Sequence, residues 1–390
     1  MPFDNSPHPP RSFRRKRRVA IALLAVAVVL IGVWAAKRHF SGFHLRRTVA
    51  LWVNPAADGS SAFSSFPIEF SRNGRFVAAR DHDYGICILN ASTGNRLGRL
   101  SAGVDSVAAD SYVFSADGQT IVAAGYCGNV YVWDVSAQEV IRNFALTDKP
   151  VVVEGSTTTY PCWGVMISKD GSKVVSGDHK DGTIQVWNVE TGEPEVTLSE
   201  MGDQYPRSFS DRGNLLAVAS DGELSIWDVS RSPARRLVSI DQELSGRVDS
   251  IFSSNERILA TVNSQQEVML WDCRKGTLLG TISPVDGTVA SAAVERLAFC
   301  LDDSVLVTGL DWRTAPWWTA ITGSSWLFES DRGCVRFWDV ANGEELESVF
   351  VESDIGSIAV SADGTELAIG SWEGTMTLWT SRSALRPRTE

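Results

Sequence analysis

Short apolar segments recur along this chain, and most of them end in a tryptophan followed by a small polar residue. The recurring pairs are Trp133-Asp134, Trp187-Asn188, Trp227-Asp228, Trp271-Asp272, Trp338-Asp339 and Trp379-Thr380, with Leu89-Asn90 in a weaker first copy. The steps from one pair to the next are 44, 54, 40, 44, 67 and 41 residues. Short runs rich in β-branched and aromatic residues are typical of strands. The pattern predicts seven tandem units built from strands.

Each unit carries a second landmark upstream, an apolar residue and a serine followed by a tight turn. One copy reads Phe114-Ser115-Ala116-Asp117-Gly118, whereas the sixth reads Phe299-Cys300-Leu301-Asp302-Asp303. Asp-Gly supplies the positive φ that a two-residue hairpin needs, so each landmark should join the inner strand of a unit to its second strand. Periods of about 40–45 residues are typical of four-stranded propeller blades. The sequence therefore predicts an all-β, seven-bladed β-propeller over residues 44–380.

The pattern resembles the WD40-repeat family across these residues. The resemblance implies blades tied by a network of the tryptophan, a second-strand hydroxyl, a turn aspartate and a histidine. The matching aspartates are Asp83, Asp181 and Asp221, Ser176 matches the hydroxyl, and the histidine is absent throughout. Because one hydrogen bond contributes only about 1 kcal/mol, burial between blades decides the fold. The repeated tryptophans are interpreted as structural, and the aspartates that follow them as turn formers.

The two ends of the repeat region predict how the ring closes. The residues after Trp379, 380–390, are polar and would form a poor fourth strand for the last blade, and 381–390 are predicted to be a C-terminal tail. The segment from His44 to Trp52 has no blade of its own. We expect it to supply the outer strand of the seventh blade, which would leave no open sheet edge at the junction.

An apolar segment precedes the repeats. Residues 19–36 contain no charge, and their length of 18 is close to the ~20 residues that cross a bilayer. Six basic residues precede the segment and four follow it, which favours a cytoplasmic N-terminus. The sequence predicts a basic tail (1–18), an uncleaved signal anchor (19–36), a linker (37–43) and an extracytoplasmic propeller. A cleavable signal peptide is the alternative, because Val33-Trp34-Ala35 loosely fits a cleavage site.

Net charge and the absence of catalytic motifs narrow the classes of function that this chain can have. The chain through Arg47 carries ten basic residues and one acidic residue, so the net charge of −11 leaves −20 on residues 48–390. An acidic body argues against a nucleic-acid ligand. No HExxH, GxSxG, phosphate-loop or GxGxxG motif occurs, and we predict no catalytic residue, metal or cofactor. Carboxylates around the central channel remain the route by which a propeller could be an enzyme.

The six cysteines show no metal-binding spacing. Cys87, Cys300 and Cys334 lie in or beside strands and are interpreted as small core residues. Cys127 and Cys162 fall in two loop types that share one face of a propeller, so a disulfide between them is geometrically possible if the domain is exported.

Two insertions are the candidate binding surface. The first, Asp311–Phe328, contains Trp312, Trp317, Trp318 and Trp326. The second, Asp148–Pro161, contains Tyr160 as its second-last residue. In the family geometry both open on one rim, and Trp and Tyr dominate binding hot spots. The alternative is that the Trp-rich loop packs on itself as a cap. Three functions stay open: a membrane-tethered scaffold for a protein or peptide partner, a small-molecule or glycan sensor, and a propeller-type enzyme.

Overall fold

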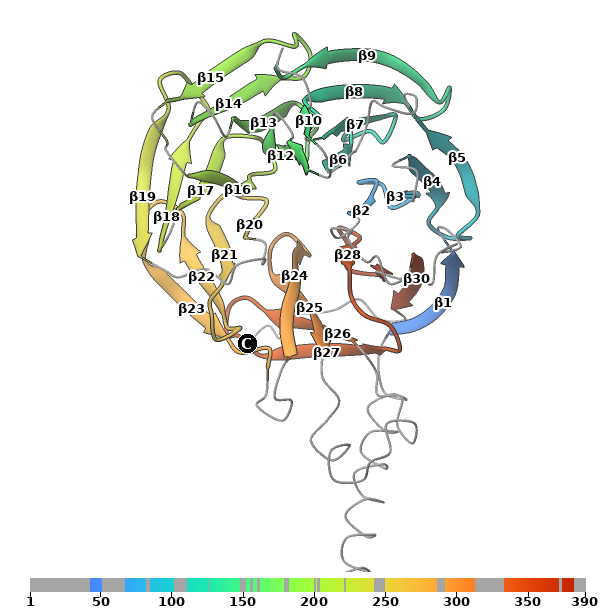
Figure 1. Ribbon diagram of the computed structural model, residues 1–390. Coiled ribbons are helices and arrows are strands. Elements are labelled where there is room, and N and C mark those ends of the chain that lie inside the picture. The colour runs from blue at the N-terminus through green and yellow to red at the C-terminus, as the bar shows by residue number, and fades with distance from the viewer. Residues whose placement is uncertain are drawn as a thin grey trace, which may run out of the picture. The chain divides into compact units, whose positions relative to one another are not determined.

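Seven four-stranded antiparallel sheets follow one another around a central axis, with the first strand of each innermost (Figure 1). The computed structural model describes residues 43–50, 67–81, 85–101, 111–125, 127–147, 152–154, 157–159, 162–178, 182–199, 201, 204–220, 222–241, 250–285, 292–312, 333–371 and 374–381. All of these lie in one compact unit, Phe43–Glu390. The predicted tail and anchor lie outside the described residues. Within the described ranges, no helix is long and apolar enough to cross a membrane.

Each sheet is one blade, and the predicted number of seven is confirmed. Blades 1 to 3 consist of β2 (Ile68–Phe70), β3 (Phe76–Arg80), β4 (Ile86–Asn90) and β5 (Arg96–Leu100); β6 (Ser111–Phe114), β7 (Thr120–Ala124), β8 (Asn129–Asp134) and β9 (Glu139–Ala145); and β12 (Trp163–Ile167), β13 (Lys173–Asp178), β14 (Thr183–Asn188) and β15 (Pro194–Leu198). Blades 4 and 5 consist of β16 (Tyr205–Phe209), β17 (Leu215–Ser220), β18 (Glu223–Asp228) and β19 (Arg235–Asp241); and β20 (Ile251–Phe252), β21 (Ile258–Val262), β22 (Val268–Asp272) and β23 (Leu278–Ile282). Blade 6 consists of β24 (Ala292–Cys300), β25 (Val305–Trp312), β26 (Gly333–Asp339) and β27 (Glu345–Val351).

The seventh blade takes its outer strand from the start of the propeller, as predicted. Its strands are β28 (Ser357–Val360), β29 (Glu366–Gly370), β30 (Thr375–Ser381) and β1 (Phe43–Ala50). β1 pairs antiparallel with β30, from Phe43 opposite Ser381 to Ala50 opposite Thr375. Phe43 was assigned to the linker, which is wrong: it is only 2% exposed and its ring stacks on Phe337 at 4.9 Å. Likewise Ser381, which the sequence places in the C-terminal tail (381–390), belongs to β30.

The core is divided into seven apolar clusters, one between each pair of neighbouring blades. The residue that ends the third strand packs against the preceding blade. Trp133 of blade 2, for example, lies among Ile86 and Ile88 of blade 1, and Leu89 takes the same place between blades 7 and 1. Burial of a large side chain at each junction stabilises the ring by about 2–3 kcal/mol per residue. The structural interpretation of the repeated tryptophans is therefore confirmed.

Each of five repeated indoles donates a hydrogen bond to a hydroxyl group two register positions away. The hydroxyl lies on the second strand in Trp187–Ser176, Trp271–Thr261 and Trp338–Thr308, and on the same strand in Trp227–Ser225 and Trp379–Thr377. The donor–acceptor distances run from 2.9 to 3.2 Å. Ser176 is confirmed as a partner, whereas Asp83, Asp181 and Asp221 lie outside the described residues.

The hairpin between the first and second strands is longer than predicted. Ser71 N donates to Phe76 O at 3.0 Å, so four residues form the loop, and only Gly74 has a positive φ, of 68°. Asn73 does not supply a second one. Its side chain instead accepts from Ser71 Oγ at 2.8 Å, while Ser71 Oγ accepts from Phe76 N at 2.9 Å. The landmark serine therefore organises the turn, and the same bonds recur at Ser115, Ser168 and Ser361.

Blades 5 and 6 have an acidic residue where this turn otherwise has glycine. Glu256 and Asp303 adopt φ values of 59° and 68°. Each carboxylate accepts hydrogen bonds from the turn of the preceding blade: Glu256 from Ser210 Oγ at 2.8 Å, and Asp303 from Ser254 N at 2.7 Å and Asn255 N at 2.9 Å. A strained backbone is thus combined with a polar link between blades.

Candidate functional site

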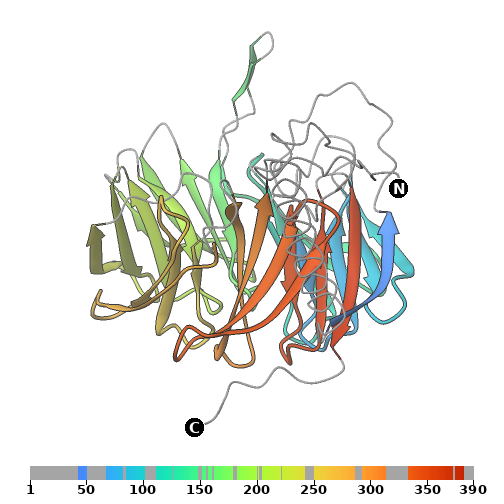
Figure 2. The ribbon, with the colours of Figure 1, turned by 90° about the horizontal axis from the view of Figure 1, so that it is seen from below.

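The antiparallel blades give the ring two different faces. We call lower the face that holds the first-to-second and third-to-fourth hairpins, and upper the face that holds the remaining connections. β1, in blue in Figure 2, runs from the lower to the upper face. The connection from β25 to β26 and the one from β9 to β12 both leave from the upper face. The two insertions therefore depart from one face, as the family geometry implied.

The Trp-rich insertion begins later than the sequence indicated. Trp312 was assigned to it, but the backbone of Trp312 belongs to β25 and pairs with Ala292 on β24. The inserted residues are therefore 313–332, and Trp317, Trp318 and Trp326 lie outside the described residues, as does Tyr160. The partner-binding role of these aromatic residues stays a prediction.

The insertion before blade 3 contains two strands that were not predicted. β10 (Val152–Glu154) and β11 (Thr157–Thr159) form a hairpin in which Val152 lies opposite Thr159. Consecutive valines and consecutive threonines on either side of a glycine were the available sequence signal, because β-branched residues favour strands. The insertion before blade 3 therefore contains regular secondary structure.

A charged group lies around the central channel at the lower face. It comprises Glu69 on β2 and the first-hairpin residues Arg72, Lys169, Asp211 and Asp303. These residues belong to blades 1, 3, 4 and 6, and blades that are not neighbours face one another only across the axis. Lys169 and Arg72 are exposed and Glu69 is half-buried, so water reaches the group although protein surrounds it.

The channel charges influence one another. Burial among the blades raises the pKa of Glu69 from 4.5 to about 7, with Lys169 opposing this shift and Asp211 adding to it. Burial would lower the pKa of Lys169, but the carboxylates of Glu69, Asp211 and Asp303 outweigh it and the pKa is raised. The acids that an enzyme would need are thus present in the channel. A lysine lies among them, and no described residues form a group suited to holding a metal ion.

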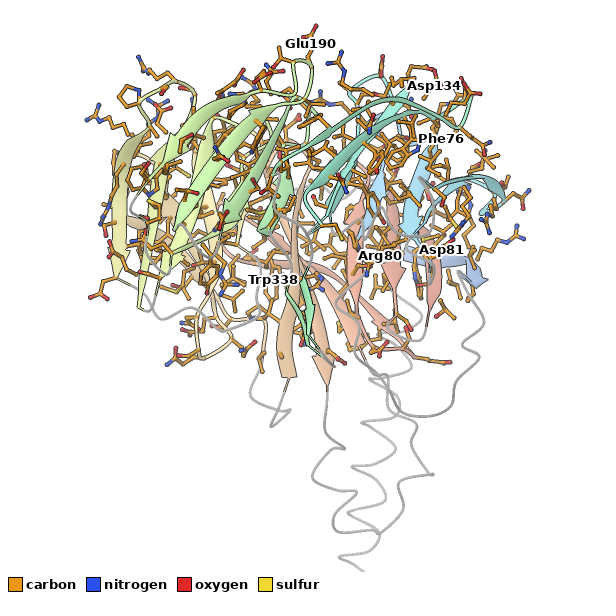
Figure 3. All side chains as sticks on the ribbon, turned by 45° about the horizontal axis from the view of Figure 1, so that its top comes forward. Phe76, Arg80, Asp81, Asp134, Glu190 and Trp338 are labelled. Carbon is orange, nitrogen blue, oxygen red and sulfur yellow. The ribbon has the colours of Figure 1, made fainter. Side chains whose placement is uncertain are left out.

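Blade 1, which lacks the tryptophan, has an ion pair that the sequence did not indicate. Arg99 on β5 donates to Asp81 through Nε at 2.6 Å, and Gly85 N donates to Asp81 at 2.9 Å. Burial would raise the pKa of Asp81, but these hydrogen bonds outweigh it and the pKa is lowered. Figure 3 labels Asp81 beside Arg80, a fully buried arginine at the end of β3. The outer and second strands of this blade are therefore joined by charge.

Cys127 and Cys162 are not joined by a disulfide in the structure. Cys162 is 4% exposed and lies in the apolar cluster of Val130 and Leu146 between blades 2 and 3. The core interpretation of Cys87, Cys300 and Cys334 is confirmed, since all three are buried. Burial raises the pKa of Cys87 to about 11 and that of Cys300 to about 12, which leaves both thiols protonated and unreactive at neutral pH.

The aspartates after the repeated tryptophans form turns, as predicted. Asp134 accepts hydrogen bonds from Ser136 N and Ala137 N, both at 2.8 Å, at the periphery of the ring (Figure 3). Asp272 makes the same bonds with Arg274 N and Lys275 N. These backbone bonds lower the pKa of Asp134 and of Asp272. Both carboxylates serve local structure.

Comparison with known proteins agrees with this architecture. Residues 94–134, 149–188, 207–228 and 345–380 match the family described as WD domain, G-beta repeat. The chain is 26% identical over 290 residues to apoptotic protease-activating factor 1 of Rattus norvegicus, covering 72% of this chain and 20% of that protein. It is 21% identical over 290 residues to telomerase protein component 1 of the same organism, covering 70% of this chain and 9% of that protein. It is 24% identical over 263 residues to serine-threonine kinase receptor-associated protein of Gallus gallus, covering 59% of this chain and 72% of that protein.

The chain is a WD40-repeat β-propeller protein. It spans a fifth or less of the first two relatives, so their activities as whole proteins are not carried over. Propellers of this family generally bind proteins and are usually not catalysts.

Proposed function

We propose that this protein is a membrane-tethered scaffold that binds a protein or peptide partner through the upper face of its propeller. The observation that carries the proposal is the position of the two insertions. One leaves the ring between blades 2 and 3, the other leaves blade 6, and these points are half a turn apart around a seven-bladed ring. A partner that contacts both would span the upper mouth of the channel. The remainder of the fold repeats evenly, which is typical of a scaffold.

The aromatic residues of the insertions are the proposed contacts. Trp317 and Trp318 are adjacent in the longer one, and Tyr160 lies at the end of the other. Tryptophan and tyrosine supply large rigid contact area and are enriched among residues that dominate binding energies. Loops longer than about 12–15 residues in a compact domain are usually either functional or disordered.

The contact surface is tested by capture from native membranes. The full chain with Trp317→Ala and Trp318→Ala should lose its partner in a cross-linked pull-down while its thermal unfolding stays unchanged. The matched control is Leu278→Ala with Leu279→Ala, which truncates two exposed apolar side chains on the lower face. Capture that survives the tryptophan change and falls with the leucine change would place binding on the other face and contradict the proposal.

We further propose that residues 19–36 cross the membrane with the N-terminus in the cytoplasm, so that the propeller is extracytoplasmic. The uncharged segment and its basic flanks support this arrangement. A reporter that is active only after export, fused after Glu390, should be active. Activity of a reporter that works only in the cytoplasm would reverse the orientation.

A further inference from the structure

Among the residues that the structure describes, large exposed apolar side chains are confined to one end of the outer strands. They are Leu45, Leu97, Val140, Ile141, Leu278 and Leu279, between 42% and 59% exposed. Every one lies among the first three residues of β1, β5, β9 or β23. Outer strands begin at the lower face, so these apolar side chains all lie along the lower edge of the ring.

Four of the six lie on neighbouring blades and are interleaved with arginine. β1, β5 and β9 succeed one another around the perimeter as the outer strands of blades 7, 1 and 2 (Figure 1). Their basic residues are Arg46, Arg47, Arg96, Arg99 and Arg142, and their one acidic residue is Glu139. The chain from residue 48 onward has a net charge of −20, so this edge has the opposite sign to the body that carries it. We call it the basic edge.

Some of these arginines serve the fold, and others point outward. Arg46 pairs with Glu366 at 3.2 Å, and Arg99 pairs with Asp81. Arg47 donates hydrogen bonds to Thr93 O and to Asn95 Oδ1, the latter at 3.2 Å. Arg96 and Arg142 are exposed. The edge therefore offers guanidinium groups and apolar side chains to whatever lies against it.

A hollow of about 360 Å³ opens within the basic edge, between blades 1 and 2. Its wall includes Leu97 and Phe76, with the guanidinium of Arg75 lying 5.5 Å from the Phe76 ring centroid. Among the described residues of its lining Arg75 is the one that carries a charge, and Gln119 and Gln138 add amide groups. Such a lining suits an anionic group attached to an apolar body.

We propose that the basic edge of blades 7, 1 and 2 rests on an anionic phospholipid surface. Arginines near a bilayer are attracted to anionic headgroups, and exposed leucine and isoleucine insert among the acyl chains. Chain connectivity favours a bilayer over an acidic protein, because β1 begins only six residues, 37–42, after the apolar segment. Six residues span at most about 20 Å. The inference rests on the proposed tether only for this limit on the distance between propeller and membrane. A propeller that rests on its basic edge has its upper face directed away from the membrane.

The test uses the full chain in vesicles of phosphatidylcholine, with or without phosphatidylglycerol. An environment-sensitive nitrobenzoxadiazole label is placed at Ile141→Cys in a Cys127→Ser background, since the other five native cysteines are buried. The matched control is Leu279→Cys, equally exposed at the start of β23, a strand without charged residues. We expect a blue shift at position 141 only on anionic vesicles, and none at position 279. Arg96→Gln with Arg142→Gln should weaken docking roughly 30-fold, about fivefold per charge.

The outcomes separate this inference from the tether. Association with neutral vesicles tests residues 19–36, whereas the shift at position 141 on anionic vesicles tests the basic edge, whether or not the tether holds. Water-like emission at position 141 on anionic vesicles would overturn the proposal and leave the edge to an acidic protein. Equal shifts at positions 141 and 279, or a shift that survives the double arginine change, would also overturn it.

Discussion

Asp303 connects blades 5 and 6, and its replacement should destabilise the ring measurably. Its side chain is 6% exposed and accepts three hydrogen bonds from the preceding turn: Ser254 N, Ser254 Oγ and Asn255 N, at 2.7 to 2.9 Å. Asp303→Asn keeps a residue that tolerates positive φ and keeps one acceptor oxygen, but it removes the charge and the second acceptor.

The expected cost follows from these contacts. A hydrogen bond to a charged group contributes about 1.5–3 kcal/mol, but the Ser254 and Asn255 side chains are exposed and water can replace the lost acceptor. We therefore expect Asp303→Asn to lower the free energy of unfolding by about 1–2 kcal/mol. Asp303→Ala, which also places alanine at a φ of 68°, should lower it by about 3 kcal/mol.

Urea unfolding monitored by tryptophan fluorescence measures these differences when the denaturant slope is unchanged. The matched control is Asp302→Asn, because Asp302 is exposed and has a similar φ of 53°. That change should alter the free energy of unfolding by less than about 0.5 kcal/mol. The reasoning is refuted if the two asparagine variants are equally stable, or if a double-mutant cycle between Asp303→Asn and Ser254→Ala shows no coupling.

Three further predictions concern the indole bonds and the titrating acids. Thr308→Val removes the partner of the buried Trp338 indole and should cost about 1–2 kcal/mol in urea unfolding; no loss would contradict the bond. Because Glu69 has a pKa of about 7 in the fold against 4.5 unfolded, its contribution to stability falls as pH rises between these values. Glu69→Gln should flatten the pH dependence of the urea midpoint there, and an unchanged slope would count against the raised pKa. The lowered pKa of Asp81 has the opposite sign: its stabilisation is present above 3.8 and is lost as pH falls through the folded pKa. Asp81→Asn should cost about 1–2 kcal/mol near neutral pH and little in acid, and an equal cost at both would exclude the ion pair with Arg99.

The blades could be predicted because their signals are local and repeated. The indole of Trp338 and the turn carboxylate of Asp134 each recur at a fixed offset within a blade, and the strands between them have the apolar character of sheets covered on both faces. The missing outer strand of blade 7 could be assigned by elimination. The hydroxyl partners could be predicted less completely, because the family pattern places the hydroxyl on the second strand, whereas the indole of Trp379 bonds Thr377 on its own strand.

The contacts between blades could not be predicted, because they join residues that are far apart in the sequence. In the sequence, Asp303 is only the residue that replaces glycine in the sixth landmark. Its hydrogen bonds to Ser254 can be predicted only when the relative register of two blades is known. Glu69 and Lys169 come near enough to influence each other's pKa only once the ring is closed. The start of the insertion was misplaced at Asp311 because extending β25 by two residues, to Trp312, leaves no local signal. Which residues share the upper or the lower face likewise becomes known only when the ring is closed.

Closure of the ring by β1 is tested most directly by cross-linking in the full chain. His44 and Thr380 lie directly opposite each other on β1 and β30. Facing Cα atoms of an antiparallel pair are about 4.5–5.5 Å apart, which is within the range of about 4.4–6.8 Å that a disulfide spans. In a Cys127→Ser background, His44→Cys with Thr380→Cys should cross-link on mild oxidation and change mobility in a non-reducing gel. His44→Cys with Thr375→Cys, at opposite ends of the pair of strands, should not. Failure of the first pair, or equal cross-linking of both, would contradict a ring closed by its own first strand.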